Sequence, residues 1–258
     1  MTYYNYISFY LFFIFVFCLF LEIESFTPVK RLGHSSVLVG NELYFFGGDR
    51  SDTACTNEVF YLDVSQPFNI ASPPWSDLTV NEGMPIKSCW GSASLSDANN
   101  EQSIYLFGGL TRDIITNNDS FNSLVYKFNI KSGRWEIPII KGKAPERRRE
   151  INAIDNNSGK IYIFGGNNFH LGPTTESYFN DVVILDTGEL SWSISYQFNA
   201  PTIRAAYSAT LLSNGVIVYI GGHRFEVTLQ IIDISQISLY DTNSLTWSGK
   251  VCMNICIK

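Results

Sequence analysis

Short apolar runs that end in a pair of glycines recur four times along the chain. They occupy residues 43–46, 104–107, 161–164 and 217–220, directly before Gly47-Gly48, Gly108-Gly109, Gly165-Gly166 and Gly221-Gly222. A tryptophan follows each glycine pair after 25 to 27 residues, namely Trp75, Trp135, Trp192 and Trp247. The glycine pairs lie 61, 57 and 56 residues apart, and the tryptophans 60, 57 and 55. Two markers that keep one period indicate tandem structural repeats.

Each repeat is predicted to contain four short strands. In the first repeat these cover residues 34–39, 43–46 and 59–63 and begin again at Trp75. The later third strands are expected at residues 124–129, 182–186 and 237–241, each followed by turn residues and then by the tryptophan. Aromatic and β-branched residues bounded by Gly, Asn, Asp and Ser favour strands over helices. No segment after residue 25 has a helical apolar stripe, so the pattern predicts an all-β protein.

The combined motif resembles the kelch repeat. In the first repeat it consists of Arg31-Leu32-Gly33-His34-Ser35-Ser36, the run before Gly47-Gly48, residues 59–63 and Trp75. The resemblance covers residues 26–250 and implies a β-propeller with one four-stranded blade per repeat. We place the blades at about residues 26–83, 84–143, 144–200 and 201–250, followed by a non-repeat tail at 251–258.

The chain has room for four such blades. Kelch rings usually have five to seven blades, as the resemblance implies, and six would need about 340 residues. We therefore expect an incomplete ring, from a fragment or a truncated gene model, whose end blades expose apolar faces and strand edges. The alternatives are a tight four-bladed ring and an arc that associates with itself.

The N-terminus carries an almost wholly apolar run at residues 7–21. Fifteen helical residues span roughly 22 Å, which is short of the ~30 Å hydrocarbon core of a membrane. A signal peptide cleaved after Ser25 is therefore expected, and the protein is expected to be secreted or displayed at the surface. The alternative is a retained membrane anchor, because no Lys or Arg precedes the run.

Secretion would give two further sequence features a role. Asn118-Asp119-Ser120 and Asn156-Asn157-Ser158 are acceptor motifs for N-glycosylation. Four cysteines follow residue 25, and an even number in an oxidising compartment permits disulfides. Cys55 and Cys89 lie where they are able to meet, whereas Cys252 and Cys256 lie in the tail; unpaired thiols are the alternative. No Cys-x-x-Cys zinc pattern occurs.

A binding surface is predicted at one end of the propeller. The loops between second and third strands are long, at about residues 49–57, 110–123, 167–181 and 223–236, and loops on a rigid scaffold often carry recognition. The first strands begin at the same end, and aligning the repeats gives four equivalent basic residues, Arg31, Lys87, Arg148 and Arg204. Three residues further on stand His34, Trp90, Ile151 and Tyr207.

Two interpretations of the basic residues stay open. In kelch rings the first strand lines the central channel, so the resemblance implies that the four cations converge at its mouth, where they would bind carboxylates or acidic peptide segments. Alternatively, each cation pairs with a carbonyl or an acid of its own repeat.

The composition and motifs favour a non-catalytic module that binds protein or carbohydrate, with no cofactor. The net charge is −6 with 16 % charged residues, which does not indicate nucleic-acid binding, and we interpret Arg147-Arg148-Arg149 as a solvated loop end. The alternative is a copper oxidoreductase similar to galactose oxidase, whose catalytic domain has kelch-type repeats. Copper favours imidazole ligands, but the three histidines, His34, His170 and His223, lie in different repeats.

Overall fold

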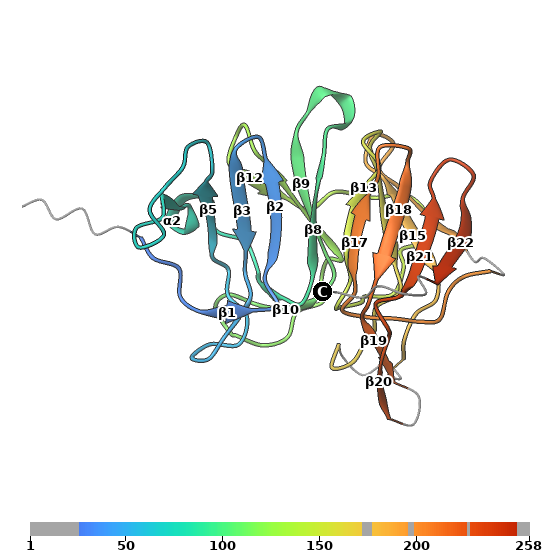
Figure 1. Cartoon of the computed structure of the whole chain (residues 1–258). Helices are drawn as coiled ribbons and strands as arrows, with labels where there is room; N and C mark the ends of the chain where they lie inside the picture. Colours follow the sequence, from blue (N-terminus) through green and yellow to red (C-terminus); the bar gives the residue numbers. More distant parts are fainter. Residues whose placement is uncertain (1–25, 172–176, 196–198, 226–227, 252–258) are drawn as a thin grey trace, which may run out of the picture.

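The structure is a computed structural model that describes residues 26–171, 177–195, 199–225 and 228–251. Its main elements are four antiparallel four-stranded sheets, one for each repeat (Figure 1). Blade 1 contains β2 (Ser35–Val39), β3 (Glu42–Phe46), β5 (Val59–Asp63) and β6 (Trp75–Asp77). Blade 2 contains β8 (Ser92–Ser96), β9 (Ser103–Phe107), β11 (Val125–Asn129) and β12 (Arg134–Glu136).

The second half of the chain repeats this order. Blade 3 contains β13 (Ala153–Asp155), β14 (Lys160–Phe164), β15 (Val182–Asp186) and β16 (Ser191–Ser195). Blade 4 contains β17 (Ser208–Leu211), β18 (Val216–Ile220), β21 (Gln236–Asp241) and β22 (Thr246–Val251). The predicted all-β propeller with four four-stranded blades is therefore confirmed. Helical structure in the described residues is limited to α2 (Thr79–Glu82) and a 3₁₀ turn at Ala98–Asn100.

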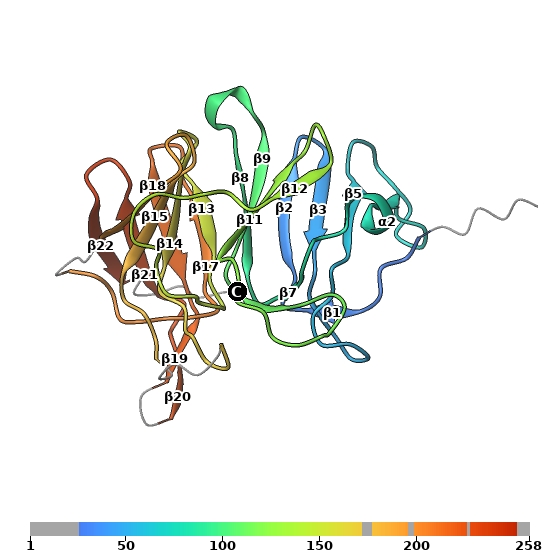
Figure 2. The same cartoon turned by 180° about the vertical axis from the view of Figure 1, so that it is seen from behind.

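Short two-stranded sheets extend the loop face on which the second-to-third-strand loops lie (Figures 1 and 2). They pair β1 (Arg31–Leu32) with β4 (Asp49–Arg50), β7 (Lys87–Cys89) with β10 (Leu110–Arg112), and β19 (His223–Phe225) with β20 (Leu229–Ile231). In every repeat the residue after the glycine pair is bridged to a residue just before the first strand. These pairs are Leu32–Asp49, Cys89–Leu110, Arg149–Asn167 and Ala205–His223.

The core consists of three apolar clusters, each formed between consecutive blades. One joins blades 1 and 2 through Phe46 and Phe128, another joins blades 2 and 3 through Phe107 and Ile161, and the third joins blades 3 and 4 through Phe164. The second and third strands of blades 2 and 3 are accordingly buried on both faces. Among the described residues no cluster combines blade 1 with blade 4, and the two blades lie at opposite ends of the row (Figures 1 and 2).

The first glycine of each pair allows neighbouring blades to approach closely. Gly108 has a φ of +60°, and a Cβ atom there would lie 2.2 Å from the carbonyl oxygen of Arg148 in the next blade. Gly47 and Gly165 make the same approach to Ser88 and Arg204. The side chain is therefore excluded both by the backbone conformation and by the adjacent blade.

The apolar run at residues 7–21 and the tail from residue 252 lie outside the described residues. Within the described part of the chain, no helix is long and apolar enough to cross a membrane. The signal peptide, the alternative anchor and any bond of Cys252 or Cys256 therefore remain predictions.

Candidate binding surface at the propeller axis

The strand register places the predicted basic positions relative to one another. Ser35, Ser92 and Ser208 pair with the last residue before the glycine pair in their repeats. Four residues before these three serines stand Arg31, Ser88 and Arg204. In blade 3 the register of β13 and β14 gives Arg148 as the equivalent residue. Ser88, and not Lys87, is therefore the residue of blade 2 that is equivalent to the three arginines, so the predicted alignment is wrong by one residue. For the same reason Gly91, and not Trp90, is equivalent to His34, Ile151 and Tyr207.

Arg31 and Arg148 make the same set of contacts within their own blades. Arg31 donates to the carbonyl of Gly47 (3.0 Å) and forms an ion pair with Glu58, while its guanidinium lies over the Phe60 ring. Arg148 donates to the carbonyl of Gly165 (3.1 Å) and binds both carboxylate oxygens of Asp181, at 2.7 and 3.2 Å. A bidentate pair of this kind holds the guanidinium in one orientation.

Arg204 has the same position without the acid. It is 1 % exposed and donates to the Gly221 carbonyl (3.5 Å) and to the Ser238 hydroxyl (3.1 Å). Gln236 takes the place of the acid before the third strand, and no acidic partner of Arg204 is found among the described residues. Burial accordingly lowers the pKa of Arg204.

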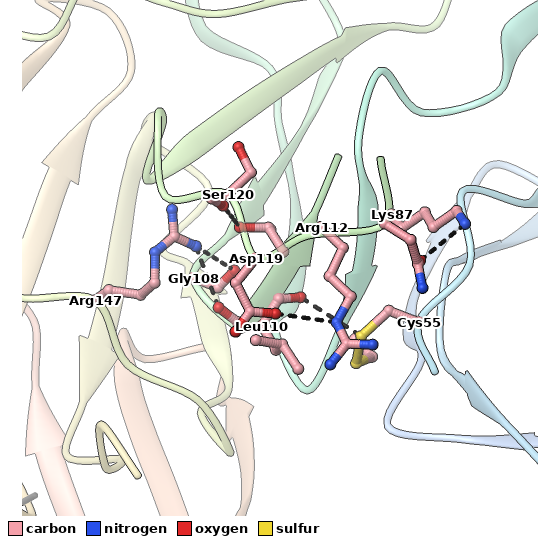
Figure 3. The surroundings of a disulfide bond; sticks show 12 residues. Cys55, Lys87, Gly108, Leu110, Arg112, Asp119, Ser120 and Arg147 are labelled. Atoms are coloured by element: carbon pink, nitrogen blue, oxygen red, sulfur yellow. Dashed lines mark hydrogen bonds and ion pairs between the residues drawn. A yellow bond between two sulfur atoms is a disulfide. The ribbon is translucent and has the colours of Figure 1, made fainter. Parts of the chain in front are cut away.

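Blade 2 obtains its guanidinium from the following repeat. Arg147 donates to the carbonyls of Gly108 (3.1 Å), Gly109 (3.2 Å) and Ser123, and Figure 3 shows it directed toward Gly108. Its burial lowers its pKa. The interpretation of residues 147–149 as a solvated loop end is therefore wrong, because Arg148 is buried and its two neighbours are half-buried.

The remaining predicted residues lie apart from a common pocket. Lys87 donates to the side-chain oxygen of Asn117 (3.0 Å) in an exposed loop (Figure 3). Tyr207 is buried between blades 3 and 4, where its hydroxyl donates to the Phe164 carbonyl and burial raises its pKa to about 12. His34 is exposed with its ring against Phe45. The contacts of the arginines thus follow the structural interpretation, and ligand binding by these residues remains a prediction.

Four residues with left-handed backbone surround the axis on the loop face. Gly33, Trp90, Glu150 and Ala206 precede the inner strands of the four blades and have φ values of +61°, +62°, +57° and +52°. Their backbones form a chain of hydrogen bonds between blades: Trp90 N–H donates to Gly33, Glu150 N–H to Trp90 and Ala206 N–H to Glu150, at 2.6, 3.0 and 2.8 Å. The inner strands of consecutive blades are neighbours, so this chain of hydrogen bonds runs past the loop-face ends of the four inner strands.

A network of side chains, here called the axial cluster, lies on this chain and consists of Trp90, Arg149, Glu150, Tyr178 and His223. The guanidinium of Arg149 lies 5.0 Å from the centre of the Trp90 ring and 3.1 Å from the Glu150 carboxylate. The second oxygen of that carboxylate lies 3.4 Å from Nε2 of His223. Nδ1 of His223 is hydrogen-bonded to the Tyr178 hydroxyl at 3.2 Å.

The axial cluster is held firmly in place. The buried side chain of Asn167 donates to Glu150 at 2.8 Å, so this carboxylate has partners from three segments. Burial and the nearby Glu150 charge raise the pKa of Tyr178. The sequence analysis named Trp90 as a binding residue but gave Arg149 and His223 other roles and did not name Glu150 or Tyr178, because the contacts of His223 and Tyr178 with the cluster join residues far apart in the chain.

Two of the cysteines and both predicted glycosylation sites lie in the first three blades. Cys55 and Cys89 form a disulfide, which joins the loop of blade 1 to β7 at the start of blade 2 (Figure 3); the expected proximity of these two residues is confirmed. Asn118 is exposed in a loop, whereas the side-chain oxygen of Asn156 accepts bonds from Ser158 and Lys160 in a turn. Across the described residues, no three His, Cys, Asp or Glu side chains gather closely enough to hold a metal ion.

The repeated arginine–glycine–acid contacts and the blade order agree with the comparison with known proteins. Residues 33–256 match the profile of the KLHDC2/KLHL20/DRC7 Kelch-repeats domain. The chain belongs to this kelch family. Kelch-repeat propellers usually mediate protein binding.

Relatives of the chain extend beyond the part that is matched. Kelch domain-containing protein 3 of Rattus norvegicus is 26 % identical over 224 residues, which cover 85 % of this chain and 54 % of the relative. Tip elongation aberrant protein 1 of Schizosaccharomyces pombe is 30 % identical over 202 residues, covering 75 % and 16 % of the two chains. The chain thus spans about half the length of the kelch domain-containing protein that it matches.

A solved structure shares the fold. The structure of YjhT aligns with a TM-score of 0.62 and 15 % sequence identity, and the alignment covers 90 % of this chain and 68 % of that one. At this identity the likeness shows the propeller fold alone.

Proposed function

We propose that this kelch propeller is a non-catalytic module that binds a protein partner through the axial cluster. The observation that carries the proposal is a network of half-buried side chains that joins Trp90, Arg149 and Tyr178 through Glu150 and His223. Trp, Tyr and Arg are the residue types that contribute most to protein interfaces. They stand on the loop face, from which the two-stranded sheets extend.

The preorganisation of the axial cluster supports binding. Glu150 fixes Arg149 and His223 from opposite sides, and Asn167 fixes Glu150. Side chains that are already ordered lose little freedom when a partner binds. The mixture of one acid, one guanidinium and two aromatic rings suits a polar protein segment, such as an acidic peptide, and also suits carbohydrate.

The first test compares two arginine variants in affinity capture from extracellular material. Arg149→Ala removes the guanidinium beside Trp90, and Arg134→Ala removes an exposed arginine of β12 that lies away from the axis. We expect Arg149→Ala to reduce recovery of the captured proteins at least tenfold and Arg134→Ala to leave it unchanged. Equal recovery with both variants would contradict the proposal.

A second variant separates recognition from folding. Trp90→Gly deletes the indole yet suits the left-handed backbone, since Gly33 occupies the equivalent position in blade 1. Capture should fall while the thermal unfolding temperature stays within a few degrees of the parent. Absence of catalysis is tested in parallel by copper analysis and by peroxide release from galactose, and release above background would favour the oxidoreductase alternative.

We further propose that the protein enters the secretory pathway. The Cys55–Cys89 disulfide supports this, since disulfides persist mainly in oxidising compartments, and so does the apolar run at residues 7–21. N-terminal sequencing of protein from a eukaryotic host should begin after Ser25. Treatment with a glycosidase should lower its mass, and Asn118→Gln should remove at least part of that shift.

A further inference from the structure

A cavity stands beside the interface between blades 3 and 4. It has a volume of about 520 Å³, and its wall includes Ser238 and Gly249, which pair across β21 and β22. Two residues away on the same strands stand Tyr240 and Trp247, which pack in the apolar cluster between blades 3 and 4. Since residues two apart in a strand share a face, the cavity lies on the face of blade 4 that is turned toward blade 3.

The guanidinium of Arg204 lines this cavity without a charged partner. Arg204 is 1 % exposed and donates to the Gly221 carbonyl and the Ser238 hydroxyl, while its Nε is buried without a hydrogen-bond partner. A guanidinium carries more N–H donors than these two contacts use. A buried charge is costly unless it is paired, and within the described residues no carboxylate pairs with this one.

Blade 3 has an equivalent cavity in which the charge is already paired. This cavity has a volume of about 530 Å³ and is lined by Arg148, Asp181, Phe179 and Ile194. Asp181 binds Arg148 through both carboxylate oxygens, and the Phe179 ring centre lies 4.2 Å from the guanidinium carbon. Blade 3 thus shows what a complete site of this kind contains.

Blade 4 differs from blade 3 at three positions around its arginine. Counted from the aspartates that end the third strands, and along the pairs of the fourth strands, the replacements are Asp181 by Gln236, Phe179 by Ile234 and Ile194 by Gly249. The first removes the carboxylate, the second removes the ring, and the third removes a side chain from the wall. A Cβ atom at Gly249 would meet the Ile237 carbonyl oxygen at 3.8 Å, an ordinary contact distance, so the space left there is free.

The other residues that line the cavity suit an anion. Thr202, Ser235 and Ser238 supply hydroxyl groups, and Lys250 also borders the space. Asp233 is the one acid in the wall; it is exposed, and its carboxylate accepts a hydrogen bond from the Ser235 amide at 2.8 Å. Hydroxyl and guanidinium groups together are donors for a ligand with several acceptor oxygens.

We propose that this cavity binds an anionic group with several oxygen atoms, a carboxylate, sulfate or phosphate, in the place that Asp181 has in blade 3. Arg204 binds it through the N–H groups that Gly221 and Ser238 leave free, because guanidinium groups pair with such anions through two parallel hydrogen bonds. The proposal is independent of the partner of the axial cluster, since no member of that cluster lines the cavity.

The test measures the melting temperature of the purified full-length chain with acetate, sulfate or phosphate at millimolar concentration. Each ion is compared with sodium chloride of equal ionic strength. At least one ion should raise the melting temperature by about 3 °C or more, because a ligand that binds only the folded state stabilises it. A largest shift with acetate would identify a carboxylate site, and a largest shift with sulfate or phosphate would identify a site for those groups.

Three variants connect the shift with this cavity. Arg204→Met removes the guanidinium, and Gln236→Glu supplies a carboxylate of the protein that competes with the ion, so both should lose the shift. Gln66→Glu makes the same change of charge in an exposed loop of blade 1 and should keep it. Because Gln236→Glu completes the pair found in blade 3, its loss of the shift cannot come from a folding defect.

The same measurements define failure. A parent whose melting temperature none of the three ions raises would overturn the proposal, and so would a shift that persists in Arg204→Met or in Gln236→Glu. Loss of the shift in Gln66→Glu would overturn it as well, because the net charge of the protein would then explain the effect. None of these outcomes bears on capture of a partner by the axial cluster.

Discussion

The first glycine of each pair is fixed by two separate constraints. Gly108 has a positive φ and also lies against the carbonyl of Arg148, 2.2 Å from where a Cβ atom would be. Gly40 has a similar φ, +58°, but has nothing within 4 Å of its Cβ position. The two glycines therefore separate the cost of the backbone conformation from the cost of the clash.

We expect Gly108→Ala to lower the free energy of unfolding much more than Gly40→Ala does. A left-handed conformation costs an alanine about 1–2 kcal/mol, which applies to both variants. At Gly108 the clash with the next blade adds to it, so the total should exceed about 3 kcal/mol, as is typical of a disrupted core. Urea unfolding of both variants measures the difference, and equal losses would show that the blades separate freely at this point.

Arg204 leads to a prediction of increased stability. Because Gln236 stands where blades 1 and 3 have Glu58 and Asp181, Gln236→Glu supplies the missing acid to a buried guanidinium. We expect a gain of about 1 kcal/mol in the free energy of unfolding. In the background of Arg204→Met the same substitution should give no gain, and a gain that persists there would show that the carboxylate acts elsewhere.

For single residues, the sequence predicted which residue types recur in the repeats but aligned the second repeat with the others wrongly by one residue. Aligning the repeats by their basic residues places Lys87 at the position of Arg31, and Trp90 then falls at the position of His34 and Tyr207. The structure instead places Trp90 at the left-handed position of Gly33, Glu150 and Ala206, where an aromatic residue is uncommon. Nothing in composition signals such a conformation, and only the pairing of Ser92 with Phe107 reveals it.

Among the elements, the strands followed their sequence pattern closely. Third strands expected at residues 59–63 and 182–186 have those bounds in the structure. The position of a strand end is well defined by the sequence where an apolar run is followed by Gly-Gly, Asp or Asn. The two-stranded sheets on the loop face were not foreseen. They pair short segments such as β1 and β4 across the glycine turn, and segments of two or three residues carry no periodicity.

The disulfide connects two of these elements and gives a prediction for redox conditions. Cys55 and Cys89 are separated by 34 residues in sequence and join the loop of blade 1 to blade 2. Closing such a loop limits the unfolded chain and should contribute about 2–4 kcal/mol. We expect dithiothreitol to lower the melting temperature of the parent, and the double variant Cys55→Ser/Cys89→Ser to have the lower value with and without reductant. An unchanged parent would show that the bond contributes little.

For the molecule as a whole, the repeat period predicted the architecture, and the axial cluster could not be predicted. The period of the glycine pairs and tryptophans determines the number of blades and the order of their packing. The contacts of Glu150 with His223 and Asn167 instead come from three segments that meet only when blades 3 and 4 are assembled. Recognition surfaces on repeat proteins are built from such differences between repeats, whereas the fold is built from what repeats share.

The hydrogen-bond chain around the axis has a consequence for how the propeller opens. Each amide in it is protected from solvent by the adjoining blade, so deuterium enters only when two neighbours part. Trp90 and Glu150, whose amides and carbonyls are both bonded to other blades, should exchange more slowly than Ala206, which stands at the end of the chain of hydrogen bonds. Deuterium uptake at these three amides would thus report separately on the separation of each pair of neighbouring blades, and would show which pair separates first.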